Sequence, residues 1–302
     1  MTDPAPLQMP SSPPDGTAEI LDRGYRRYDG PRNGRSGAVL ALFTASVQRA
    51  LGLRRSFRHK IVPLISAVIA YIPAIVFVGV AALLPGELAS EVTVDYSGYY
   101  GFITAAIVLF AAITGPEVLC VDRKTGMLGL YLASPLTRDT YLVAKAGALV
   151  ATVSIVTLGP PLLLLAGYSF VDLGPEGIGD LLVAFGRIVL AGIVIAALLC
   201  ALALAVAAVT PRKGFAAAAI ILVLLVSSIM TGILIDVADA PEWLNVLNLF
   251  FLPFDVVSRI YGESQNNFVG VSNVVSIGAY VAWTAGFAAF TRFRYHRLMI
   301  TR

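Results

Sequence analysis

Long apolar segments separated by short polar ones run through most of this chain of 302 residues. A helix needs about 20 apolar residues to cross the hydrocarbon core of a bilayer, and six segments reach or approach that length. The pattern therefore predicts an all-α integral membrane protein with six transmembrane helices. The predicted spans lie at residues 61–84, 98–117, 141–167, 182–208, 215–235 and 273–291.

The third predicted span contains the sequence Gly159-Pro160-Pro161. Proline lacks a backbone N–H group and its ring clashes with the preceding helical turn. We therefore expect the helix to be interrupted here and its last turns to bend away.

The part of the chain before the first span divides into two predicted regions. Residues 1–37 are rich in Pro, Gly, Ser and Arg and poor in aliphatic residues, which is typical of disorder. We expect a disordered cytoplasmic region there and a six-span domain at residues 38–302. Within that domain, residues 38–60 have apolar side chains at helical spacing and basic residues near the end. This predicts an amphipathic helix on an anionic membrane surface.

Residues 236–272 lie between the fifth and sixth predicted spans and are apolar, but acidic residues interrupt them. The segment is too interrupted to cross a membrane. It predicts one or two short helices that enter the membrane from one face and rest on protein. An ordinary amphipathic surface loop is the alternative.

Composition and charge support a membrane protein and set its orientation. Hydrophobic residues make up 57% of the chain and charged residues 14%, whereas about a quarter of a soluble domain is charged. Twenty of the 22 Lys and Arg residues lie in the N-terminal region, the 120–145 segment, the 210–214 turn and the C-terminal tail. Basic residues favour the cytoplasmic side. We therefore expect both termini and the 120–145 segment to be cytoplasmic. The use of Ala, Gly and Val, and of Arg over Lys, indicates a bacterial source, so we expect a multi-pass protein of a bacterial plasma membrane.

Few ionisable residues fall inside the predicted spans. Glu117 ends the second span on the cytoplasmic side, and Asp236 ends the fifth. Arg187 lies near the outer end of the fourth span, where it can reach outward or meet an acid such as Asp180. None lies at mid-membrane, which argues against a proton- or sodium-coupled carrier.

The segment from Gly115 to Lys145 is charged yet partly apolar. Charges flank a group of apolar residues, and Pro135 is expected to end any helix there. We expect a short helix that lies along the membrane face or docks into a groove of another protein. The apolar residues are Met127, Leu128, Leu130, Tyr131, Leu132 and Leu136.

This segment resembles the cytoplasmic loop between the second and third spans of type-2 ABC exporter permeases, the transmembrane subunits of ATP-driven exporters. Those permeases usually have a Thr after the Gly and an acidic residue after the next Leu, where this chain has Met127 and Gly129. The matching residues are Glu117, Asp122, Arg123, Lys124, Gly126, Leu128, Leu132, Ser134, Pro135, Leu136, Thr137, Arg138 and Lys145.

The resemblance implies a set of structures and partners. Residues 38–60 would form the elbow helix of such permeases, and residues 236–272 their re-entrant helices. A separate ATPase subunit would dock on the helix near residues 123–135. A second permease subunit, identical or different, would complete the path among membrane lipids, and no nucleic acid is expected. We predict that Glu117 is the cytoplasmic gate. The predicted ATPase-coupling residues are Arg123, Lys124, Leu128, Tyr131, Leu132 and Arg138.

The chain carries no sequence motif for chemistry of its own. It has no phosphate-binding GxxxxGK[ST] sequence, no HExxH and no Gly-x-Ser-x-Gly. Its two cysteines, Cys120 and Cys200, lie in different segments, without the spacing of metal ligands. We therefore expect no catalytic, cofactor or metal site in this chain, with ATP and magnesium held by the partner ATPase.

The leading hypothesis is a permease subunit that exports a hydrophobic or amphipathic substrate, such as a drug or a lipid. A polar solute would lose about 1–3 kcal/mol for each hydrogen bond left unsatisfied in so aliphatic a lining. Mid-span aromatic residues, chiefly Phe77 and Phe110, are too few to line a sugar path. A non-transporting scaffold or sensor subunit and a secondary carrier are the alternatives.

Overall fold

The computed structural model contains helices and connecting turns, and no β-strand, over the residues that it describes. These are residues 30, 34–53, 57–84, 88–89, 91, 93–133, 135–263, 268 and 270–297. The unit that spans Gly34–Arg302 contains all of the helices named below. The predicted disordered region at residues 1–37 falls almost wholly outside the described residues, so it and the boundary at residue 38 stay predictions.

Among the described residues, six helices are long and apolar enough to cross a membrane, which confirms the predicted all-α architecture with six candidate spans. The fifth, α8, continues into one turn of π-helix, η1 (Ile233–Val237). The six are α2 (Phe57–Leu83), α4 (Tyr96–Lys124), α6 (Arg138–Phe170), α7 (Ile178–Ala207), α8 (Lys213–Gly232) and α10 (Asn273–Arg297).

Three of these helices, α4, α6 and α7, form the centre of the bundle. In the most apolar stretch of α4 and of α7, 67% of the residues are buried, against 17% in α8 and in α10. Small residues allow the central helices to approach closely. A Cβ atom on Gly115 of α4 would lie 2.6 Å from the Cβ atom of Ala203 in α7. The outer helices therefore leave their apolar faces for lipid or for another protein.

The predicted interruption of the third span is wrong, because α6 is continuous through Pro160 and Pro161 to Phe170. The missing N–H group of Pro161 leaves the carbonyl of Thr157 without its intrahelical donor. The hydroxyl of Tyr100 in α4 donates to that carbonyl over 3.2 Å. A neighbouring helix thus satisfies the group that the proline frees, and the helix has no need to break.

The N-terminal amphipathic helix is shorter than predicted. The helix α1 covers Gly34–Ala50 and ends in a turn, so a single helix through residue 60 is wrong. Gly52 has a positive φ of 69°, which favours glycine. The N–H groups of Gly52 and Leu53 bond to the carbonyls of Arg49 and Gln48, a standard helix-ending arrangement. Of the basic residues that follow, Arg58 and Lys60 belong to the first turn of α2, and Arg54 and Arg55 lie outside the described residues.

Three short helices can be described between α8 and α10, where short helices are predicted; residues 264–267 and 269 lie outside the described residues. The three short helices are η1, the 3₁₀-helix η2 (Glu242–Leu247) and α9 (Leu252–Ile260). Inside α9, the buried Asp255 forms an ion pair of 2.7 Å with Arg259. Asp255 also accepts a hydrogen bond from Ser276 of α10. These polar residues therefore fasten α9 to α10, and entry of the short helices into the bilayer stays a prediction.

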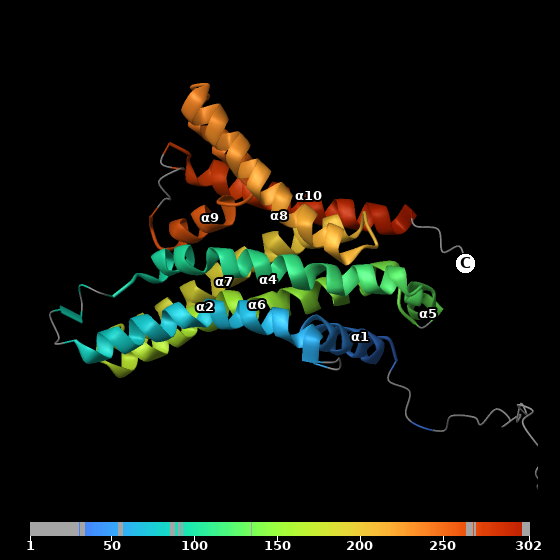
Figure 1. The fold of residues 1–302 in the computed structure, drawn as a ribbon, viewed down its shortest axis with the longest axis horizontal. Helices are drawn as coiled ribbons and strands as arrows, with labels where there is room; N and C mark the ends of the chain where they lie inside the picture. Colours follow the sequence, from blue (N-terminus) through green and yellow to red (C-terminus); the bar gives the residue numbers. More distant parts are fainter. Residues whose placement is uncertain are drawn as a thin grey trace, which may run out of the picture. The chain divides into compact units, whose positions relative to one another are not determined.

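The helix α5 (Met127–Ala133), the helix α1 and the C-terminal end of α10 lie at the same end of this unit (Figure 1). The helix α9 lies toward the other end, and α8 diverges from its neighbours. We call the end that carries α5 the coupling end. This end contains the end of α4 and the start of α6, which flank α5, together with the last turns of α7 and α10.

Candidate functional site

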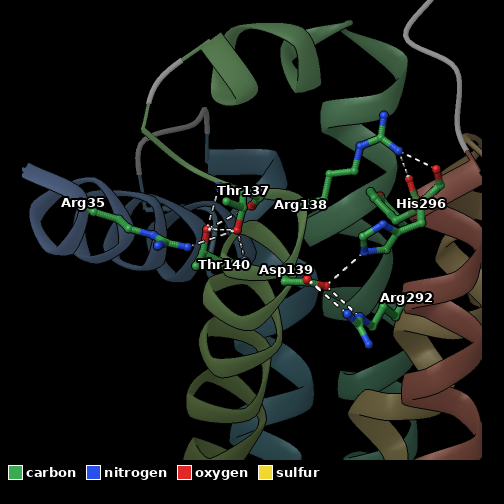
Figure 2. A network of polar contacts seen from close by, with 8 residues as sticks. Arg35, Thr137, Arg138, Asp139, Thr140, Arg292 and His296 are labelled. Carbon is green, nitrogen blue, oxygen red and sulfur yellow. Dashed lines mark hydrogen bonds and ion pairs between the residues drawn. The ribbon is translucent and has the colours of Figure 1, made fainter.

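The helix α5 is set off from its neighbours by two local signals. Gly126 has a φ of +69° in the turn after α4, a conformation that favours glycine. After α5, Thr137 begins α6 with a capping box: its side chain accepts from the backbone N–H of Thr140, and its own N–H donates to the Thr140 side chain (Figure 2). The short helix predicted before Pro135 is therefore present.

The side chains of α5 divide between the protein core and solvent. Leu128 and Tyr131 are half-buried against the core of the unit, and the ring of Tyr131 lies 5.9 Å from that of Tyr141. Leu130 is 66% exposed, and Lys124 just before α5 is exposed as well. The side chain of Leu132 lies outside the described residues. The outward face of α5 therefore presents Leu130 more than the predicted Leu128 and Tyr131.

Arg123, at the end of α4, points toward α7 and is half-buried. Its Nη1 atom donates to the carbonyls of Ala208 at 2.7 Å and Ala207 at 3.2 Å. The last carbonyls of a helix lack intrahelical donors and carry partial negative charge. Arg123 thus caps the C-terminus of α7.

Arg138, at the start of α6, makes the equivalent contact with α10. Its Nη1 atom donates to the carbonyls of Tyr295 at 3.3 Å and His296 at 2.5 Å (Figure 2). The adjacent Asp139 accepts from Arg292 at 2.8 and 3.2 Å and lies 3.1 Å from His296. The first turn of α6 therefore holds the last turn of α10 through both backbone and side-chain contacts.

Asp122, Arg49 and Lys145 form a cluster of charged side chains centred on a buried carboxylate. Asp122 of α4 is fully buried and forms ion pairs with Arg49 of α1 and Lys145 of α6, the latter at 2.6 Å. The hydroxyl of Tyr141 donates to the same carboxylate over 2.9 Å. Burial lowers the pKa of Arg49, but the neighbouring Asp122 outweighs it and the net pKa is raised, so Arg49 stays charged. The cluster joins the N-terminal helix to two spans.

Asp122 and Lys145 both belong to the sequence pattern that resembles the family, but that pattern does not pair them. They lie on different helices, and helical spacing along one segment reveals nothing about contacts between segments. The available signal is physical: an isolated charge beside a buried apolar stretch is costly unless a partner neutralises it. This cost predicts that Asp122 has a cationic partner, but it does not predict which residue that partner is.

Glu117, the predicted gate, pairs with the first residue of α8. Lys213 Nζ lies 2.5 Å from Glu117 Oε1, and both side chains are partly exposed. The pair joins α4 to α8 near the coupling end. Its role as a gate stays a prediction.

Arg187 near the start of α7 meets an aromatic ring. Its guanidinium carbon lies 6.0 Å from the centre of the Tyr261 ring, within reach of a cation–π contact. Tyr261 follows α9, so this contact links α7 to the segment between the fifth and sixth spans. Asp180, the partner suggested by the sequence, lies in the same helix as Arg187, whereas Tyr261 comes from a segment far along the chain.

In the part of the chain that the structure describes, six long apolar helices pack around a close-packed centre, which is the architecture of a multi-pass helical membrane protein. The family model of the ABC-2 family transporter proteins matches residues 22–298, and the chain belongs to that family. The resemblance to an ABC-2 type permease is thereby confirmed. A comparison with the curated proteins gives no match.

Proposed function

We propose that this chain is the membrane-spanning permease subunit of an ATP-driven exporter and that a separate ATPase subunit docks on α5. The observation that carries the proposal is the position of α5, a partly exposed short helix whose two flanking arginines contact two different spans. Membership of a transporter family supports transport, and the lack of a phosphate-binding motif in the sequence supports a separate motor.

The coupling end is proposed to face the cytoplasm. It carries Lys124 and Arg138 beside α5, and Arg292 and Arg294 at the end of α10. An excess of Lys and Arg favours the cytoplasmic side of a membrane. This orientation places both termini in the cytoplasm of a bacterial cell, with the protein in the plasma membrane.

The docking face would consist of Lys124 and Leu130. Among the described side chains of α5, Leu130 is the most exposed large apolar one and suits a groove on the ATPase surface, and Lys124 suits an acidic rim. ATP and magnesium would be bound by the ATPase. Nucleotide-driven movement of that subunit would then be transmitted through α5.

A second permease subunit and an apolar substrate complete the proposal. The low burial of α8 and α10 leaves apolar faces that a second subunit or lipid can cover. Between α6, α7 and α10 lies a cavity of about 470 Å³, a size typical of small-molecule sites. Its lining is mostly apolar, including Val143, Val150 and Leu204. This lining supports a hydrophobic or amphipathic substrate over a hydrated one.

Purification of the native complex tests the proposal. An ATPase subunit should co-purify with the wild-type chain, and hydrophobic drugs or lipids should stimulate ATP hydrolysis in the reconstituted complex more than soluble glycans do. Lys124→Glu with Leu130→Ser should release the ATPase. Arg294→Glu, which alters an exposed charge at the same end, is the matched control.

Two other results would favour the alternative functions. Transport that follows a pH or sodium gradient and ignores ATP would favour a secondary carrier. A stable complex with an ATPase that moves none of the tested substrates would favour a scaffold or sensor subunit.

A further inference from the structure

The two arginines that flank α5 face the protein interior and contact different spans. Arg123 contacts the end of α7, more than 80 residues away in sequence, and Arg138 contacts the end of α10, more than 150 residues away. We infer that Arg123 and Arg138 are positioning residues that fasten the two sides of α5 to α7 and α10. A displacement of α5 would then reach α7 through the end of α4 and α10 through the start of α6. The coupling role rests on the proposed function, whereas the fastening itself does not.

The contact on the α4 side consists of more than one bond. Three residues on successive turns of α4 contact the turn between α7 and α8 or the first residue of α8. Arg123 donates to Ala208, the thiol of Cys120 lies 3.2 Å from the carbonyl of Thr210, and Glu117 pairs with Lys213. The sites at 117, 120 and 123 are each three residues apart and so lie on one side of the helix. The end of α4 therefore holds this turn and the start of α8 at three points.

The contact on the α6 side is also multiple. Arg138 donates to the last carbonyls of α10, and Asp139 binds Arg292 and approaches His296 (Figure 2). Charged donors form shorter and stronger hydrogen bonds than neutral donors, and a guanidinium satisfies carbonyls that have no donor of their own. The start of α6 and the end of α10 should therefore move together.

Burial distinguishes these arginines from the residues proposed to contact the ATPase. Arg123 and Arg138 are half-buried and their guanidinium groups are engaged by helix ends. Lys124 is exposed, and no hydrogen bond or ion pair joins its ammonium group to any residue that the structure describes. Lys124 therefore provides a matched control, because its substitution by Gln removes one positive charge next to Arg123 without removing a described contact to α7 or α10.

Distances between spin labels on the isolated permease test the fastening. A label at Leu130→Cys on α5 is paired with one at Phe290→Cys on α10, or with one at Val209→Cys beside the end of α7; all three native side chains are exposed. The native Cys120 and Cys200 are buried, and labelling of the parent chain without introduced cysteines measures their background. Both distance distributions should be narrow in the parent.

Each arginine should affect its own distance. Arg138→Gln should broaden the 130–290 distribution and leave 130–209 unchanged, and Arg123→Gln should do the reverse. Lys124→Gln should broaden neither. Arg138→Lys and Arg123→Lys, which keep a charged donor, should give intermediate widths. These Lys variants also test the inference if a Gln variant does not fold.

The assembled complex provides the second measurement. With either Gln variant the ATPase subunit should still co-purify, but substrate moved per ATP hydrolysed should fall several-fold, with partial recovery in the Lys variant. Unchanged distance distributions in the Gln variants, or equal broadening by Lys124→Gln, would overturn the inference. Failure of any ATPase to co-purify with the wild-type chain would instead count against the proposed function, and the distance results would stand.

Discussion

Lys145 Nζ of α6 lies 2.6 Å from Asp122 Oδ2 of α4, and the exposed fractions of these side chains are 1% and 0%. An ion pair this deeply buried contributes little over an apolar pair, yet removing one partner leaves a charge without compensation. Asp122 is shared with Arg49, so its loss affects two cations at once. This shared carboxylate is the basis of the first prediction.

Asp122→Asn should destabilise the protein by about 3–5 kcal/mol, because Lys145 would be left buried and unpaired. Denaturant unfolding in detergent measures the change. Arg49→Gln should cost less, since the Arg49 side chain is 23% exposed and solvent screens it. The double variant Asp122→Asn/Lys145→Met should recover part of the loss. If Asp122→Asn were as stable as the wild type, the buried pair of Asp122 and Lys145 would not be important for stability.

Tyr100→Phe should cost about 1–3 kcal/mol, because the Thr157 carbonyl freed by Pro161 would lose its donor. Pro161→Ala restores a backbone N–H for that carbonyl, so in this background Tyr100→Phe should cost clearly less. A double-mutant cycle on unfolding free energies measures the difference. Equal costs in both backgrounds would show that Tyr100 does not compensate for the proline.

Gly115→Ala should force α4 and α7 apart, because the new Cβ would lie 2.6 Å from the Cβ atom of Ala203. Overpacking of this kind costs about 1–3 kcal/mol. Gly101→Ala in the same helix is the matched control, since its Cβ would meet nothing within 4 Å. The control should be neutral or gain up to about 1 kcal/mol from helix propensity. Thermal unfolding that ranks the two variants in the opposite order would refute close α4–α7 packing.

Glu117→Gln should change transport more than stability. The pair with Lys213 is partly exposed, so its loss should cost no more than about 1 kcal/mol. If the pair gates the cytoplasmic side, transport per ATP should change and the exchanged variant Glu117→Lys/Lys213→Glu should restore it in part. If Glu117→Gln and Lys213→Gln both transport as the wild type does, the Glu117–Lys213 pair is not part of the gate.

The orientation is testable with single cysteines in intact cells. Cysteine at Glu176, exposed after α6, should react with an impermeant reagent from outside, and cysteine at Thr125, exposed before α5, should not. Cysteine at Arg212 should behave as at Thr125, because it lies in the turn that α4 contacts. Reaction at Thr125 in unbroken cells would invert the proposed topology.

The number of spans follows from sequence because the length of an apolar run directly reflects the thickness of the bilayer. The ends of the helices do not follow so simply. The helix α4 continues to Lys124 although the predicted span ends at residue 117, since a helix can extend beyond the membrane. The break predicted at residues 159–161 fails for another reason: the donor that rescues α6 comes from Tyr100, which no pattern within α6 reveals.

The position of the candidate site along the chain could be predicted from the sequence, but the directions in which its side chains point could not. The unusual charge content of the 115–145 segment indicates the position of α5, and a family pattern indicates its use. Which way Arg123 and Arg138 point depends on the helix ends beside them, and these come from residues far along the chain. Likewise, the inward direction of Tyr131 depends on Tyr141 in the next span.

The buried Asp122 also constrains the order in which the protein can be assembled during synthesis. Of its two cationic partners, Arg49 precedes it in the chain and Lys145 follows it. When α4 leaves the ribosome, α1 is already available to neutralise the carboxylate, whereas α6 is not yet made. We therefore expect α1 to neutralise Asp122 and so to assist membrane insertion of α4 before α6 has been synthesised. Deleting α1 should accordingly delay insertion of α4 in a cell-free membrane translation reaction more than it delays insertion of α10.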